Sequence, residues 1–343
     1  MKKMMTEIVG NEKLKTHICR NILENTLPHA CIIEGPKGTG KHTVAYMAAA
    51  ALACTELKDQ SMPVPCLECN YCRKVLERKS PDVILVGSEG KASIGVDAIR
   101  FLREDVHIIP NDLEFKIYII EDADKMTLQA QNALLLTLEE PPSYVRFFLL
   151  CESANALLET IRSRAPVFRT EPLSEEEIDS YIASHDSRAA QMKLSSPKEY
   201  ARLLLASGNG IGKALEYLDA KTFAPVLENI KLAEIFIELA VKRGSNRDAL
   251  AIMPKFYAKR EVLRPLLPLL SDAIRDLIML KESDSATLRF YSDREHAIDL
   301  CDRTSLYNLF SINRAIDSAI EENARNANVR LLVTKLFSSV NLI

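Results

Sequence analysis

The segment EGPKGTGKHT, from Glu34 to Thr43, constrains the fold of this chain more than any other stretch. Two of its glycines are separated by four residues, and a lysine follows the second, as in the first part of a phosphate-binding loop. An apolar run from Ala30 to Ile33 precedes the loop, and a helix-forming segment from Val44 to Ala53 follows it. Because the motif requires a strand before the loop and a helix after it, this context predicts an α/β core of the P-loop type.

A second apolar segment predicts a strand with an acidic end. Lys116 to Ile120 is a short β-branched and aromatic run with little polar alternation, which is typical of a strand buried on both faces of a parallel sheet. Glu121 and Asp122 follow at its carboxyl end, and in an open α/β sheet that edge faces the ligand crevice. Thr127 can cap a following helix that runs to Glu139, after which two prolines stop it.

Two further motifs carry a family resemblance. NALLLTLEEPP, from Asn132 to Pro142, is followed by an apolar strand and then by Ser163 and Arg164 within TIRSRAPVF. Together with the loop and the acidic strand, these motifs resemble bacterial DNA polymerase III clamp loader subunits, which belong to the AAA+ superfamily. The resemblance is dense from Ile8 to about Thr170 and thin beyond. It implies an α/β plus all-α architecture: an AAA+ P-loop core with a parallel sheet and an inserted zinc module, a small helical lid and a C-terminal helical collar.

Length and helical patterning set the expected domain boundaries. At 343 residues the chain is expected to hold two or three domains. A capped, acid-rich helix start follows Pro172, and the pattern is helical throughout from about Lys221. We therefore expect the AAA+ core in residues 1–172 with a zinc module at about 54–72, the lid in 173–219, and the oligomerising collar in 220–343.

The phosphate loop keeps its cradle but lacks its usual magnesium ligand. The glycines that let backbone amides approach a phosphate, and the lysine that would meet its outer oxygens, are Gly35, Gly38, Gly40 and Lys41. The next position should be Ser or Thr, whose hydroxyl binds magnesium, and here it is His42. Thr43 comes one place late, about 100° further round the helix. Magnesium prefers oxygen ligands, so these residues favour a loop that keeps its shape without metal-assisted chemistry.

The acidic pair also departs from a working ATPase site. Such a site carries Asp for magnesium and then Glu to activate water, whereas this chain has Glu121 and then Asp122. Each carboxylate is displaced by one methylene, about 1.5 Å, and a misplacement near 1 Å can cost about 100-fold in rate. By resemblance, Glu152 replaces a neutral polar sensor and Gly212 replaces a sensor arginine. We expect a degenerate site, and whether ATP or ADP binds there stays open.

Four of the eight cysteines fall in one short segment. Their spacing is C-x11-C-x2-C-x2-C, and they are Cys54, Cys66, Cys69 and Cys72. A cytosolic chain seldom keeps disulfides, so four clustered thiols predict a zinc site. Thiols fill all four positions and leave none for water, which predicts a structural site. The resembling γ/τ and δ′ subunits carry such a module at this place. The other cysteines are expected in the core: Cys19, Cys31, Cys151 and Cys301.

Ser163 and Arg164, followed by Ala165, match the family's Ser-Arg-Cys motif with alanine in the last place. In that family the arginine reaches into the ATP site of the neighbouring subunit as an arginine finger. The resemblance therefore assigns this role in trans to Arg164, with Arg162 and Arg169 as less favoured neighbours. An ordinary surface arginine is the alternative interpretation. A trans arginine suits a chain without an ATPase of its own.

Composition and the terminal sequence exclude several classes of protein. A net charge of −3 gives no global field that would draw the chain to nucleic acid or anionic lipid. The first residues, MKKMMTEIVG, lack the apolar core of a signal peptide. The longest apolar run, Met47 to Cys54, is far shorter than the roughly 20 residues of a membrane helix. We expect a cytoplasmic protein without a membrane partner.

These patterns together favour a non-hydrolysing δ′-type subunit of the replicative clamp loader, with zinc as a structural cofactor. The resemblance implies a hetero-pentamer with γ/τ and δ subunits, which loads the sliding clamp onto primer–template DNA. An ATP-hydrolysing γ/τ-type subunit is the alternative. A stand-alone zinc-dependent nucleic-acid-binding module is a third interpretation, against which the small net charge and the lack of basic–aromatic interleaving weigh.

Overall fold

The computed structural model describes residues 4–57, 63–88, 90, 92–208, 210–242, 246–257, 260–283 and 285–342. The chain divides into two compact units. The first comprises Met1–Tyr181 with Asn209–Lys213, and the second comprises Ile182–Gly208 with Ala214–Ile343. The finer division into core, lid and collar at residues 172 and 219 stays a prediction.

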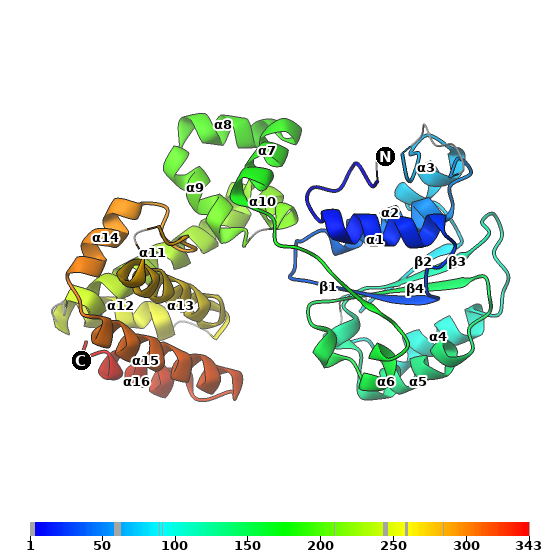
Figure 1. Ribbon diagram of the computed structural model, residues 1–343. Helices are drawn as coiled ribbons and strands as arrows, with labels where there is room; N and C mark the ends of the chain where they lie inside the picture. Colours follow the sequence, from blue (N-terminus) through cyan, green and yellow to red (C-terminus); the bar gives the residue numbers. More distant parts are fainter. Residues whose placement is uncertain are drawn as a thin grey trace. The chain divides into compact units, whose positions relative to one another are not determined.

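The first unit is built on a five-stranded parallel sheet (Figure 1). The strands, in the spatial order β2-β3-β4-β1-β5, are β1 Ala30–Glu34, β2 Val83–Val86, β3 Lys116–Ile120, β4 Val145–Cys151 and β5 Val167–Arg169. Every neighbouring pair is parallel, with Ala30 opposite Phe147 and Lys116 opposite Val145. All five residues of β3 are buried, as its apolar sequence predicts. The predicted parallel sheet is therefore confirmed.

Helices cover both faces of this sheet (Figure 1). One face carries α1 Glu12–Leu23, α2 Lys41–Leu52 and α3 Asn70–Leu76, and the other carries α4 Val96–Asp105, α5 Leu128–Glu139 and α6 Glu159–Arg162. Successive strand side chains point to opposite faces, so Ile33 packs into the α1–α2 cluster while Ile32 packs into the α4–α5 cluster. The short 3₁₀ helices η1 Ala123–Lys125 and η2 Ala154–Ala156 follow β3 and β4. These turns lie where the carboxyl ends of the strands present the candidate site.

Local sequence signals fix two of the helix starts. The hydroxyl of Thr127 accepts a hydrogen bond from the N–H of Ala130 at 3.2 Å, which confirms the predicted cap of α5. At the start of α7 (Glu175–His185), the N–H of Glu177 donates to Ser174 Oγ at 3.2 Å. The N–H of Ser174 donates to Glu177 Oε2 at 2.9 Å in return. This reciprocal pair is a capping box, as the acid-rich start after Pro172 predicts.

All regular secondary-structure elements among the described residues of the second unit are helices. Its helices are α8 Ser187–Ser195, α9 Pro197–Ala206, α11 Ala220–Lys242, α12 Asn246–Tyr257, α13 Arg260–Glu282, α14 Arg294–Asp302, α15 Leu306–Ala324 and α16 Val329–Ser339; α10 Ile211–Tyr217 begins in the first unit and ends in the second. The rings of Phe236, Phe256 and Phe337 meet in the core with centroids 5.1 to 5.5 Å apart. The all-helical pattern predicted for the C-terminal part is confirmed.

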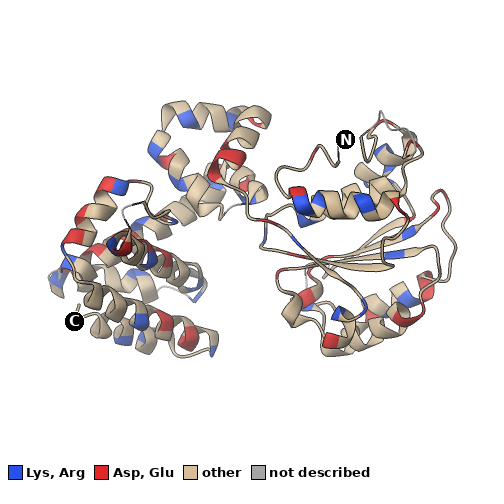
Figure 2. Ribbon diagram, in the orientation of Figure 1, with Lys and Arg blue, Asp and Glu red and all other residues tan. Residues whose placement is uncertain are grey.

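Charged residues of both signs are interspersed along the helices of each unit (Figure 2). This distribution agrees with the small net charge of −3. Within the described part of the chain, no helix is long and apolar enough to cross a membrane.

Candidate functional site

The phosphate loop lies between β1 and α2 and is folded around its own lysine. Gly38 and Gly40 have φ angles of 88° and 84°, a conformation that favours glycine and turns the loop into the helix. The Lys41 ammonium donates to the carbonyl of Gly35 at 2.5 Å and to that of Pro36 at 2.9 Å. The sequence-predicted loop residues are therefore brought together, and the lysine charge is held inside the loop.

The electrostatic surroundings of Lys41 act in two directions. Burial lowers the pKa of Lys41, and the negative charges of Glu152 and Asp124 oppose that shift. The N–H of Glu152 donates to Asp124 Oδ2 at 3.4 Å. The other oxygen of Asp124 is buried and has no hydrogen-bond partner within the described residues. Negative charge at this edge therefore acts on Lys41 through space, and an ATP phosphate here would meet like charge.

Residues at the expected magnesium and base positions contact other protein groups. His42 Nδ1 lies 2.9 Å from Glu121 Oε1, with 45% and 30% of the two side chains exposed. Asp122 is paired with Lys125, whose ammonium donates to its Oδ2 at 2.7 Å. Thr43 is exposed on the first turn of α2. The structure thus brings His42 and Glu121 together, and it directs Asp122 to a different partner.

A glycine-rich segment at the start of α10 touches the tip of the phosphate loop, and both belong to the first unit. A Cβ atom added to Gly210 would lie 3.0 Å from the carbonyl carbon and oxygen of Gly38. The same addition at Gly212 would meet Gly38 Cα at 3.7 Å, which is an ordinary contact distance. Backbone therefore packs on backbone at the place where the resemblance puts a sensor arginine.

A second set of contacts, which the sequence analysis did not foresee, anchors the base of the loop. Glu34 Oε1 accepts the N–H of Ala154 at 2.9 Å, and Glu34 Oε2 accepts Arg169 Nε at 2.7 Å. Thr39 and Thr170 share a hydroxyl hydrogen bond of 3.0 Å. Spacing gave no signal for these contacts, because the partners lie more than 100 residues apart. Arg169, one of the less favoured finger candidates, is occupied by this ion pair.

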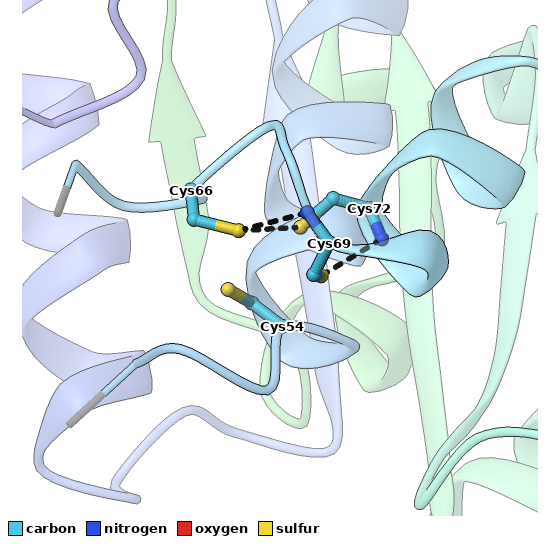
Figure 3. A group of neighbouring side chains, drawn as sticks. All are labelled: Cys54, Cys66, Cys69 and Cys72. Atoms are coloured by element: carbon cyan, nitrogen blue, oxygen red, sulfur yellow. Dashed lines mark hydrogen bonds between the residues drawn. The ribbon is translucent and has the colours of Figure 1, made fainter. Parts of the chain in front are cut away.

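The four clustered cysteines converge on one point between α2 and α3 (Figure 3). Their Sγ atoms lie within 4.8 Å of one another, and those of Cys66 and Cys72 are 3.9 Å apart. Burial opposes ionisation of Cys69, but hydrogen bonds from the backbone N–H groups of Cys72 and Thr55 outweigh it and lower its pKa to about 6. The thiolate is the form that binds a metal ion. Residues 58–62 of the expected module lie outside the described residues.

The size and chemistry of this cysteine cluster fit a zinc ion. Four thiolates at the usual Zn–S distance of about 2.3 Å form a tetrahedron with S···S edges of about 3.8 Å, close to the observed Cys66–Cys72 separation. The N–H of Cys69 donates to Cys66 Sγ and that of Cys72 donates to Cys69 Sγ, both at 3.4 Å, so the backbone stabilises negative charge on the sulfurs. The remaining four cysteines are buried, as predicted for core residues.

Arg164 lies just after α6 and is held at the surface of its own subunit. Its Nη2 donates to Glu139 Oε1 at 2.8 Å, and its Nη1 donates to the carbonyl of Thr160 at 3.0 Å. The neighbouring Arg162 is exposed and donates to Asn155 at 3.3 Å. The sequence gave no indication that Glu139, the last residue of α5, would contact Arg164.

Residues 10–174 match the family model described as "DNA polymerase III, delta subunit". The chain is 33% identical to the δ′ subunit of DNA polymerase III from Bacillus subtilis over 224 residues, which are 65% of this chain and 63% of that protein. The chain belongs to the clamp loader family of AAA+ proteins. It is also 32% identical to the τ/γ subunit from Haemophilus influenzae, over 53% of this chain and 26% of that protein.

Among solved structures, a DNA polymerase III γ subunit-related protein from Thermotoga maritima aligns with 96% of this chain and 98% of its own, at 19% identity and a TM-score of 0.48. The clamp loader chain spans only about a quarter to two thirds of the lengths of the curated relatives named above. These relatives carry the names of both γ/τ and δ′ subunits, so the type of subunit has to be argued from the site itself.

Proposed function

We propose that this clamp loader protein is a non-hydrolysing δ′-type subunit, which helps to load the sliding clamp onto primed DNA. The observation that carries the proposal is the 2.9 Å contact between His42 and Glu121. A P-loop ATPase uses a hydroxyl and a carboxylate at these positions to hold magnesium beside the phosphates. Here the His42 imidazole contacts the Glu121 carboxylate, so the two side chains pair with each other at the positions where an ATPase holds magnesium.

The rest of the nucleotide site supports the same proposal. Asp122 stands where an ATPase has the water-activating Glu, and its carboxylate is engaged by Lys125 at 2.7 Å. Glu152 adds negative charge where an active member has a neutral sensor. Gly212 supplies no side chain where an active member has a sensor arginine. These changes add negative charge, or they remove positive charge, a metal ligand or the base, and phosphoryl transfer depends on the balance of charge, the metal ion and the base.

The cysteine cluster is proposed to be a structural zinc site. Cys54 follows α2, while Cys69 caps α3 and Cys72 lies within it. A bound zinc ion would supply four metal–sulfur bonds that tie these helices together, and it would leave no coordination position for a substrate. The proposal concerns stability of the fold rather than chemistry.

We propose that Arg164 acts in trans and places its positive charge at the γ-phosphate of ATP bound by a neighbouring subunit. It follows Ser163 in the family's motif, and its side chain is 35% exposed. Phosphoryl transfer builds negative charge on the γ-phosphate oxygens, and an arginine supplied by a neighbour stabilises that charge. A subunit with a degenerate site of its own can therefore still take part in ATP hydrolysis.

The partners that follow from this proposal are γ/τ and δ subunits in a hetero-pentamer, with the sliding clamp and primer–template DNA reached through the assembly. The helical second unit would serve as the collar that joins the subunits. Cytoplasmic DNA replication is the setting in which such an assembly works.

ATP turnover, measured on the isolated chain and on the reconstituted loader, tests the proposed subunit type. The isolated chain should hydrolyse ATP no faster than background, and Lys41→Ala in this subunit should leave turnover by the whole loader nearly unchanged. Robust turnover by the isolated chain that Lys41→Ala abolishes would make it an ATP-hydrolysing subunit of the γ/τ type instead.

A further inference from the structure

A single carboxylate holds the proposed finger against its own subunit. Arg164 Nη2 donates to Glu139 Oε1 at 2.8 Å. The Arg164 side chain is 35% exposed and the Glu139 side chain is 47% exposed. The other bond of the guanidinium, from Nη1 to the carbonyl of Thr160, is also exposed. Water can replace both contacts, so the guanidinium can leave this position without stranding a buried polar group.

The position of Glu139 is set by α5. At the start of this helix, the Gln131 side chain donates to the carbonyl of Ala156 at 3.4 Å and accepts the N–H of Leu158 at 2.8 Å. At its end, Glu139 binds Arg164. The helix therefore contacts both ends of the short segment that carries the arginine. Glu140, the next residue, is exposed and forms no ion pair among the described residues.

Carboxylate and phosphate bind a guanidinium through the same planar fork of N–H groups. Glu139 and the γ-phosphate of a neighbour's ATP would therefore compete for the same donors of Arg164. We propose that Glu139 is a positioning residue that docks the finger on its own subunit and releases it when the neighbour's phosphate takes its place. This docking rests on the proposed trans role of Arg164.

Docking of this kind has a distinct kinetic signature. The arginine leaves Glu139 when ATP binds to the neighbour, so docking competes with formation of the engaged complex and raises the KM for ATP. The barrier to hydrolysis is measured from the engaged complex, so docking does not alter kcat. An exposed ion pair contributes at most about 1 kcal/mol, which corresponds to about a fivefold change. Glu139→Gln, which removes the charge and keeps the size, should lower the KM of the loader for ATP by up to about fivefold at unchanged kcat.

The experiment measures ATP turnover by the loader reconstituted with its own partner subunits. The five forms of this chain to be compared are the wild type, Glu139→Gln, Glu140→Gln, Arg164→Ala, and Arg164→Ala combined with Glu139→Gln. Glu140→Gln makes the same change of charge one residue away and should leave KM and kcat at wild-type values. The KM difference between Glu139→Gln and wild type should shrink from about 0.05 M to about 0.3 M salt, because salt screens an exposed pair.

The double variant shows whether Glu139 acts through the finger. If it does, Glu139→Gln has no effect in the Arg164→Ala background, as a double-mutant cycle requires. A KM change of equal size in that background overturns the docking alone, as does a fall in kcat or an unchanged KM for Glu139→Gln. If Arg164→Ala by itself leaves turnover intact, the trans role fails and the docking fails with it.

Discussion

His42 Nδ1 and Glu121 Oε1 lie 2.9 Å apart, across the carboxyl edge of the sheet where a P-loop ATPase would hold its metal ion. Both side chains are partly exposed, so the pair contributes at most about 1 kcal/mol to stability. Its importance is in the coordination chemistry. An imidazole is a poor ligand for magnesium, and the carboxylate that could bind magnesium is already occupied by it.

Gly210→Ala should disturb the phosphate loop, whereas Gly212→Ala should not. A Cβ at position 210 would lie 3.0 Å from the Gly38 carbonyl, so one backbone segment has to move. We expect a loss of about 1–2 kcal/mol in the free energy of unfolding, which is typical of overpacking. We also expect faster hydrogen exchange at the loop amides, since the contact that covers the loop opens.

Gly212→Ala is the matched control, because its Cβ would meet Gly38 only at 3.7 Å. Alanine has the higher helix propensity, so this variant should be neutral or more stable by up to about 1 kcal/mol. Denaturant unfolding and hydrogen exchange of both variants provide the comparison. Equal behaviour of the two variants would show that the contact between Gly210 and Gly38 does not constrain the loop.

Cys69→Ser should remove the metal and destabilise the first unit. The purified chain is expected to contain about one zinc ion per molecule, and a structural zinc site supplies folding free energy directly. Serine at this position removes one thiolate from the tetrahedron and weakens the site. Elemental analysis and thermal unfolding measure both effects. Cys301→Ala, in the core of the second unit, should keep the zinc content of the wild type; a wild-type chain purified under reducing conditions with almost no zinc would contradict the assignment.

Much of the first unit could be predicted because its strands are short apolar runs buried on both faces. Lys116 to Ile120 is predicted and observed with the same bounds, since all five of its residues are buried. β2 was not predicted. It lies at an edge of the sheet and Leu85 is 41% exposed, so its run of four apolar residues is not typical of a buried strand.

The sequence predicts which residues form the candidate site, but it does not predict which side chains contact each other there. The loop glycines, Lys41 and the cysteines follow from spacing, because each set is local in sequence. The contacts Glu34–Arg169 and Glu139–Arg164 join residues 135 and 25 positions apart, and no local pattern encodes them. The partner of His42 depends on a side-chain rotamer, which spacing does not determine either.

Stability should fall in alkaline solution partly because of Cys31. Burial raises the pKa of this thiol to about 12, against the opposing charge of Arg146. In the unfolded chain the thiol titrates near 8.5, so its contribution is fully present below that pH. Between about pH 8.5 and about pH 12 the unfolded state holds fewer protons, and this one group lowers the free energy of unfolding by about 1.4 kcal/mol per pH unit.

Cys31→Ala should therefore give a shallower loss of stability above about pH 8.5 than the wild type, in denaturant unfolding at a series of pH values. Ile33→Val, in the same strand, is the control, because it also removes buried volume but carries no titratable group. It should lower stability equally at every pH. Parallel curves for the wild type and Cys31→Ala would mean that the thiol ionises as readily in the folded protein as in the unfolded chain.

Arg164→Ala should abolish most ATP turnover by the assembled loader while it leaves this chain folded. The side chain is partly exposed and its two bonds lie at the surface, so its removal should cost no more than about 1 kcal/mol of stability. Zinc content and ring assembly should be unchanged, because the cysteine cluster and the helical second unit are separate from this residue. Turnover by the neighbour should fall by a factor of roughly 10³, the effect expected for an arginine finger.

Arg164→Lys should restore little of this activity, because an ammonium cannot reproduce the planar fork that binds two phosphate oxygens. Arg162→Ala, two residues earlier and also exposed, is the control and should keep nearly full turnover. The measurements are ATP hydrolysis and clamp loading onto primed DNA by rings whose composition is verified by mass. Rings that form normally with Arg164→Ala and hydrolyse ATP at the wild-type rate would show that this arginine is not the finger. Equal losses for Arg162→Ala and Arg164→Ala would instead point to a loss of general positive charge at this surface.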